Sequence, residues 1–165
     1  MEHKRKAFIA ARGFLREVLG AYLDIVPREV EFVYGEFGKP ALRNPPSLSP
    51  LYFNTSYSGE VVLVGISAVA ELGVDIEYQR DGLSFGDIAK NFFSPGETGI
   101  LKLCPALERK KRFYECWTMK EAVTKALGAG LKMALDSFEV DFTSSEGSSL
   151  SSYNGAVDIS PYFTL

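Results

Sequence analysis

The stretch that decides the fold reads CWTMKEAVTKALG and runs from Cys116 to Gly128. At about 100° per residue, a helix would place Trp117, Glu121 and Lys125 on one arc and the apolar side chains on another. The spacing therefore predicts a helix with a packing stripe and a second stripe that carries a carboxylate and an amine. A solvated Glu–Lys pair, worth only about 0.2–0.5 kcal/mol, is the alternative explanation of this second stripe.

The run Gly73-Val74-Asp75-Ile76-Glu77 alternates apolar and acidic residues, which predicts a strand. Asp75 and Glu77 are then expected on one face, where two neighbouring carboxylates repel each other. Mg²⁺ binds carboxylates together with substrate phosphates, so Asp75, Glu77 and Glu121 suit a site for a metal-bound pyrophosphate. An edge strand whose charges discourage aggregation fits the same pattern, and the residues alone leave both explanations open.

Five segments in this order resemble the signature segments of the 4′-phosphopantetheinyl transferase superfamily. They are Gly-Lys-Pro at 38–40, Phe-Asn-Thr-Ser-Tyr-Ser-Gly at 53–59, residues 73–77, Phe-Phe-Ser-Pro-Gly-Glu at 92–97 and Trp-Thr-Met-Lys-Glu-Ala-Val-Thr-Lys at 117–125. One such segment would be a weak signal, whereas five in order are specific. The likeness extends over about residues 7–142 and looks closest to the broad-specificity, surfactin-synthetase-activating type.

This resemblance implies an α+β fold with two pseudo-symmetric halves, approximately 1–77 and 78–165, within a single transferase domain. Each half would be a long helix packed on a small, mostly antiparallel sheet, with the coenzyme site in the cleft between them. Family members are usually longer at both ends, so this chain is expected to be a short or truncated member.

The resemblance also implies an enzyme of the holo-[acyl-carrier-protein] synthase type. It would transfer the 4′-phosphopantetheine arm of coenzyme A to a serine hydroxyl of an acyl or peptidyl carrier protein and release 3′,5′-ADP. Glu121 and Lys125 are the expected catalytic residues. Asp75, Glu77 and Glu121 would hold Mg²⁺ or Mn²⁺.

The coenzyme-binding residues that the resemblance implies are Arg12, Lys39, Ser56, Tyr57, Lys120 and Lys125. For Arg12 and Lys39, ordinary surface charge is the alternative. Tyr57 departs from the family pattern, which has a histidine there, and a phenol cannot become cationic near neutral pH. Trp117 is expected to pack rather than to react, and Glu97 to cap a helix that begins after Ser94.

Composition excludes several classes of protein. A net charge of −3 and a pI near 5.3 argue against a dedicated nucleic-acid-binding protein. The single histidine, His3, lies near the terminus, which excludes a serine–histidine catalytic site inside the fold. Cys104 and Cys116 have no metal-ligand spacing and are expected to be reduced, partly buried thiols. No apolar run approaches about 18 residues, so we expect a soluble, cytoplasmic protein without a membrane partner. The pseudo-symmetric halves that the resemblance implies would let one chain form the cleft, so a monomer is expected.

Periodicity and turn signals predict the remaining elements. The expected helices are 4–23, one beginning at Ser94, and 107–127; the expected strands are 30–34, 51–55, 61–67, 72–77, 138–142, 156–159 and 162–165. Residues 78–87 are expected to be a polar crossing and 144–152 a polar loop.

Two other functions fit the sequence. One is a non-catalytic relative that binds coenzyme A or a carrier domain, suggested by Tyr57 and the short ends. The other is a metal-dependent pyrophosphate hydrolase. The basic run Arg109-Lys110-Lys111-Arg112 is either a docking patch for an acidic carrier or a solvated charge run.

Overall fold

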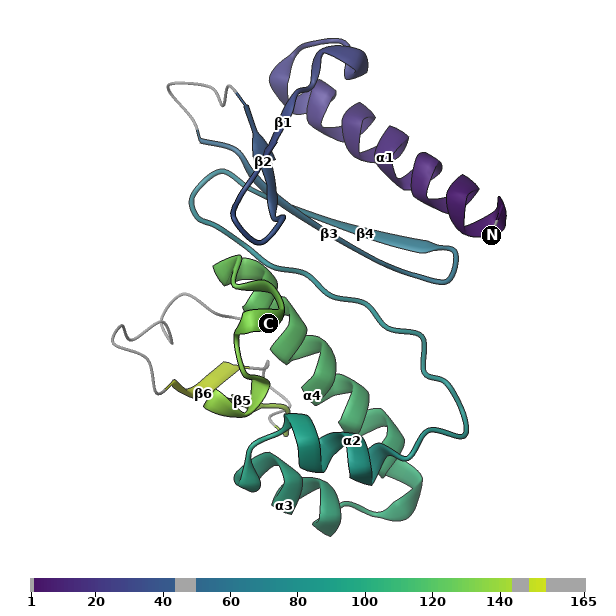
Figure 1. Ribbon diagram of the computed structural model, residues 1–165, viewed down its shortest axis with the longest axis vertical. Coiled ribbons are helices and arrows are strands. Elements are labelled where there is room, and N and C mark those ends of the chain that lie inside the picture. Colours follow the sequence, from purple (N-terminus) through teal and green to yellow (C-terminus); the bar gives the residue numbers. More distant parts are fainter. Residues whose placement is uncertain (1, 44–49, 144–148, 154–165) are drawn as a thin grey trace. The chain divides into compact units, whose positions relative to one another are not determined.

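The computed structural model describes residues 2–43, 50–143 and 149–153 (Figure 1). The chain divides into two compact units: Met1–Ile76 with Lys125–Gly130, and Glu77–Thr124 with Leu131–Leu165. Helices and two-stranded antiparallel sheets occur in the described part, so the α+β class is confirmed. None of the helices described is long and apolar enough to cross a membrane.

The first unit combines one long helix with two antiparallel strand pairs, β1–β2 and β3–β4. Its elements are α1 (Glu2–Leu23), a 3-10 turn (Pro27–Glu29), β1 (Phe32–Tyr34), β2 (Pro40–Leu42), β3 (Tyr52–Ser58) and β4 (Val61–Ser67). Leu15 and Leu19, one helical turn apart on α1, are buried. They belong to a core with Val30, Leu42 and Phe53. The C-terminal half of α1 therefore carries the packing of this unit.

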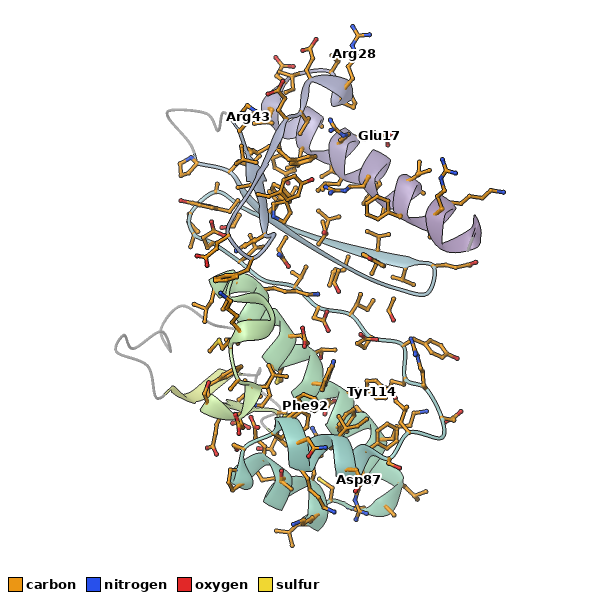
Figure 2. All side chains as sticks on the ribbon, viewed as in Figure 1. Glu17, Arg28, Arg43, Asp87, Phe92 and Tyr114 are labelled. Carbon is orange, nitrogen blue, oxygen red and sulfur yellow. The ribbon has the colours of Figure 1, made fainter. Side chains whose placement is uncertain are left out.

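The second unit packs three helices and one strand pair around an aromatic core. Its elements are α2 (Phe85–Phe92), α3 (Pro95–Leu103), most of α4 (Ala106–Leu127), a 3-10 turn at Leu135–Ser137, β5 (Phe138–Asp141) and β6 (Ser149–Tyr153). A further 3-10 turn, Gly130–Lys132, begins at the last residue of the first unit and continues into the second. The ring centroid of Trp117 lies 6.0 Å from that of Phe113 and 5.8 Å from that of Phe92, and the rings of Tyr114 and Phe85 lie 5.7 Å apart. Phe92 and Tyr114 are labelled in Figure 2. Trp117 is thus a packing residue, as expected from the sequence.

The predicted strand over 72–77 is wrong, because this segment belongs to no helix or strand. The Val74 amide donates to the Asn54 side chain at 2.9 Å instead of to a neighbouring strand. A Cβ added at Gly65 would lie 2.7 Å from the side chains of both Leu72 and Val74. The segment is therefore held against β4 by side-chain contacts that alternation cannot reveal.

Three further elements differ from the sequence predictions. Pro40–Leu42 forms β2 in a stretch without a predicted strand, and Phe85–Phe92 forms α2, which was not predicted. Ser149–Tyr153 forms β6, paired with β5, where a loop was expected. The predicted strands at 156–159 and 162–165 lie outside the described residues.

The helix start at Ser94 is confirmed in detail. Ser94 Oγ accepts from the Glu97 amide at 3.1 Å, and Glu97 accepts from the Ser94 amide at 2.9 Å, which completes a capping box. Ser94 also donates to Glu139 at 2.6 Å. Ser94→Ala is expected to lower the free energy of unfolding by about 1 kcal/mol, measured by urea denaturation. An unchanged value would contradict a stabilising cap.

Candidate functional site

Three side chains from distant parts of the chain meet in the first unit. Lys125 Nζ lies 2.5 Å from Asp75 Oδ1 and donates to Ser56 Oγ at 2.9 Å. Ser56 Oγ in turn donates to Asp75 Oδ1 at 2.7 Å. The Asp75 side chain is only 5% exposed. The structure thus brings together three of the residues that the sequence predicted to be functional.

The second carboxylate oxygen of Asp75 identifies this cluster as a candidate ligand site. Oδ2 is buried, and within the described part of the chain no hydrogen-bond partner lies within reach of it. Buried polar atoms without a partner are rare, since the loss of water is costly. A hard divalent cation prefers such carboxylate oxygens, so Asp75 fits the predicted metal.

The other two predicted metal ligands belong to the second unit. Glu77 lines a hollow of about 180 Å³ with Arg80, Tyr114 and Trp117, and Glu121 lies on α4 one turn before Lys125. Among the residues described, no group of three His, Cys, Asp or Glu side chains forms a metal-binding cluster. The complete trio therefore stays a prediction.

Asn54 is a site residue that the sequence analysis missed. It is buried, and its side-chain oxygen accepts from the Val74 amide next to Asp75. A signal was present, because Asn54 is a polar residue beside Phe53 in a predicted strand, where asparagine is disfavoured. Asn54 anchors the segment that presents Asp75.

Arg12, on α1, lies close to three aromatic rings. Its guanidinium carbon lies 5.5 Å from the Phe8 ring, 5.6 Å from Phe32 and 5.8 Å from Tyr34, and it donates to the Tyr34 hydroxyl at 2.8 Å. Such contacts orient a cation before a ligand arrives. With Tyr57, Arg12 and Tyr34 line a hollow of about 200 Å³.

Tyr57 is 62% exposed near the end of β3, which extends three residues beyond the predicted strand. It lines the Arg12 hollow and a larger groove of about 540 Å³ beside α1. Ser56, by contrast, is buried against Asp75. Alternation along β3 therefore separates these two neighbours.

Lys120, which the resemblance implied as a coenzyme-binding residue, has a side chain that is 0% exposed and lies 2.8 Å from Glu97 Oε1. Its ammonium also donates to the carbonyls of Leu135 at 2.7 Å and Phe138 at 2.6 Å. A lysine has three donors, and these acceptors occupy them, so the contacts favour a structural role for Lys120.

Lys39 is also engaged within its own unit. Its ammonium contacts Glu71 at 2.5 Å and the Ala126 carbonyl at 2.7 Å. Its side chain is 17% exposed. The resemblance implied that Lys39 anchors the coenzyme, whereas these contacts engage its ammonium within the protein.

Each residue of the basic run at 109–112 has a local partner. Arg109 donates to the carbonyls of Leu101, Lys102 and Cys104 at the end of α3. Lys110 pairs with Asp81, and Lys111 and Arg112 pair with Glu115. These contacts favour a structural charge run over a docking patch.

The two thiols are free, as expected, and Cys116 is buried. Burial raises the pKa of the Cys116 thiol, and the Glu97 carboxylate raises it further. The thiol therefore stays protonated near neutral pH, which excludes Cys116 as a nucleophile.

Comparisons with known proteins find one matching family model and several relatives. A family model described as the 4′-phosphopantetheinyl transferase superfamily matches residues 71–164, more than half of the chain. The chain is 38% identical over 149 residues to the 4′-phosphopantetheinyl transferase HetI of Nostoc sp., covering 90% of this chain and 62% of that protein.

Two further relatives are similar in extent. The chain is 34% identical over 140 residues to the 4′-phosphopantetheinyl transferase Sfp of Bacillus subtilis, covering 84% of this chain and 60% of the relative. It is 33% identical over 125 residues to the 4′-phosphopantetheinyl transferase AcpT of Escherichia coli, covering 76% and 59%. The chain thus spans about three fifths of the length of these relatives.

Proposed function

Because the chain belongs to the 4′-phosphopantetheinyl transferase superfamily, we propose that it transfers the phosphopantetheine arm of coenzyme A to a serine of a carrier protein. The observation that carries this proposal is the buried Asp75 carboxylate. One of its oxygens is paired with Lys125, and the other has no hydrogen-bond partner among the residues that the structure describes. This arrangement joins a cation suited to phosphate with an oxygen suited to a metal.

In the proposed reaction, the serine oxygen bonds to the β-phosphorus of coenzyme A while the bond from that phosphorus to the bridging oxygen breaks. The electron pair leaves with 3′,5′-ADP, and Glu121 takes the serine proton, directly or through a water. Lys125 offsets the negative charge on the leaving phosphate. Asp75 and Ser56 hold the Lys125 ammonium in place, so little reorganisation is needed.

A metal ion is part of the proposal. Mg²⁺ or Mn²⁺ held by Asp75, Glu77 and Glu121 would neutralise charge on the pyrophosphate oxygens. The unpartnered Asp75 Oδ2 supports this assignment.

Arg12 and Tyr57 are the proposed contacts for the 3′-phosphate and adenine of coenzyme A. They line one hollow, and Arg12 is already oriented by the Tyr34 hydroxyl. Ser56 is the proposed pyrophosphate contact, through its hydroxyl beside Lys125.

The finer family assignments are also proposals. They are the holo-[acyl-carrier-protein] synthase type, broad carrier specificity, pseudo-symmetric halves with a coenzyme cleft, a single domain over 1–165, a monomeric state and a cytoplasmic location. The resemblance to the superfamily supports them.

The direct test is the mass of an apo carrier protein after incubation with the chain, coenzyme A and Mg²⁺. We expect a gain of one phosphopantetheine group, which EDTA or Glu121→Ala abolishes. Several apo carriers that remain unmodified by a folded chain would contradict the proposal.

A non-catalytic relative that binds coenzyme A is the second candidate, and Tyr57, at a position where the family pattern has a histidine, favours it. In that case calorimetry would detect coenzyme A binding to a chain that transfers nothing. Transfer that depends on Glu121 would exclude this candidate.

Tyr57→His is expected to strengthen coenzyme A binding at low pH. A histidine, with an ordinary pKa near 6.5, can carry a positive charge that a phenol cannot. At this exposed position we expect the variant to bind about two- to fivefold more tightly than the unaltered chain at pH 6 and by a smaller factor at pH 8. Calorimetry at both values measures this, and an equal ratio at pH 6 and pH 8 would show that position 57 does not contact phosphate.

A further inference from the structure

Lys39 Nζ joins two segments that are far apart in the sequence. It contacts Glu71 Oε2 at 2.5 Å, the Leu72 carbonyl at 3.4 Å and the Ala126 carbonyl at 2.7 Å. All four residues belong to the first unit. An ammonium has three donors, and these three acceptors account for them.

The contact with Ala126 caps the end of α4. The helix ends at Leu127, so the Ala126 carbonyl is one of the last four that lack a partner within the helix. A cation at this end of a helix also interacts favourably with the helix dipole. Lys39 therefore stabilises the helical turn that carries Lys125.

The backbone that follows α4 packs closely against the side chains of Lys39 and Phe37. Gly128 and Gly130 have φ values of 63° and 56°, which favour glycine. A Cβ added at Gly128 would lie 3.2 Å from Lys39 Cδ, and one at Gly130 would lie 3.1 Å from Phe37 Cβ. The aliphatic part of Lys39 thus packs closely on the backbone that ends the helix.

The contacts with Glu71 and Leu72 fix the other side of the site. These residues lead directly into the segment that carries Asp75, whose carboxylate binds Lys125. Lys39 therefore holds, through one ammonium, the two backbone segments that bring Asp75 and Lys125 together.

We propose that Lys39 is a positioning residue, which fixes Lys125 against Asp75 by capping α4, and not a ligand of the coenzyme 3′-phosphate. The effect of Lys39 on the rate of transfer rests on the proposed transferase function. The effect of Lys39 on the order of the last turn of α4 does not depend on that function.

The structural consequence is tested by hydrogen exchange without coenzyme A. Lys39→Met keeps the aliphatic length and removes the donors. We expect the amides of 125–128 to exchange about tenfold faster, because a hydrogen bond to a charged group is lost. Arg12→Met, a matched loss of a cation in the same unit, should leave these amides unchanged. Unchanged exchange in Lys39→Met would overturn the proposal even if the chain transfers nothing.

The kinetic test compares coenzyme A with 3′-dephospho-coenzyme A as donors. Lys39→Met is expected to lower kcat about tenfold with both donors and to leave the ratio of their kcat/KM values unchanged. Lys39→Arg, which keeps the charge and donors, should recover part of kcat. Arg12→Met should instead reduce the preference for the 3′-phosphate. If Lys39→Met raises KM for coenzyme A alone, Lys39 binds that phosphate and the proposal is wrong.

Discussion

Lys120→Met is expected to lower the free energy of unfolding by about 3–5 kcal/mol, because it leaves the Glu97 carboxylate buried without its cation. Lys120 and Glu97 are 0% and 2% exposed, and their charged groups lie 2.8 Å apart. The ammonium also lies 4.2 Å from the Phe138 ring centroid. Urea denaturation followed by circular dichroism measures the loss.

Two controls separate this charge effect from a simple change of volume. Glu97→Gln combined with Lys120→Met removes both charges, and the glutamine oxygen can accept from the Ser94 amide but not also from the Val140 amide that Glu97 Oε1 now binds at 2.9 Å. Part of the loss should therefore be recovered. Lys102→Met, at an exposed position on α3, should change the free energy of unfolding by no more than about 0.5 kcal/mol. A loss below about 1 kcal/mol for Lys120→Met would mean that the pair contributes little.

The same pair shows where sequence reasoning succeeds and where it fails. The capping box at Ser94 could be predicted, since it depends on residues three apart. The partner of Lys120 could not, because Glu97 lies on a different helix and only packing decides which lysines of a helix are buried. Charge and motif position suggested a phosphate ligand, whereas the burial of the Lys120 side chain beside Glu97 favours a structural role.

Local pattern also limited the prediction of the segment 73–77. Its alternation is real, and it led to a predicted strand, but strand formation needs a partner backbone. Here the Val74 amide binds the Asn54 side chain instead. The long helix α4, in contrast, has its buried side chains between Phe113 and Ala126 and was predicted to within one residue at its start.

The sequence allowed three residues of the candidate site to be predicted, but not the contacts between them. Asp75, Ser56 and Lys125 were all named from the family segments, yet Lys125 lies 50 residues from Asp75 and 69 from Ser56. The periodicity of a helix or strand does not predict contacts between residues that lie so far apart in the sequence. The contact between Lys39 and the end of α4 could also not be predicted from the sequence, because it depends on the fold.

Asp75→Asn is expected to reduce phosphopantetheine transfer about a hundredfold or more at limiting Mg²⁺, since a metal centre supplies several kcal/mol of charge stabilisation. The amide preserves the shape of the side chain but removes the negative charge. It also weakens the hold on Lys125, which is paired with Asp75 at 2.5 Å. Transfer to an apo carrier, measured by intact mass across a Mg²⁺ titration, gives the size of the effect.

A readout without turnover shows whether the metal is involved. With coenzyme A present, Mg²⁺ should raise the melting temperature of the unaltered chain by mass action, and Asp75→Asn should abolish this rise. Glu31→Gln, an exposed carboxylate of the same unit that pairs with Arg43, should preserve it. If Asp75→Asn keeps the Mg²⁺-dependent rise but loses transfer, Asp75 acts through Lys125 alone, and the unpartnered Oδ2 is not a metal ligand. If Asp75→Asn keeps both the Mg²⁺-dependent rise and the transfer, the buried negative charge of Asp75 has no part in the chemistry. The cluster of Asp75, Ser56 and Lys125 would then be structural.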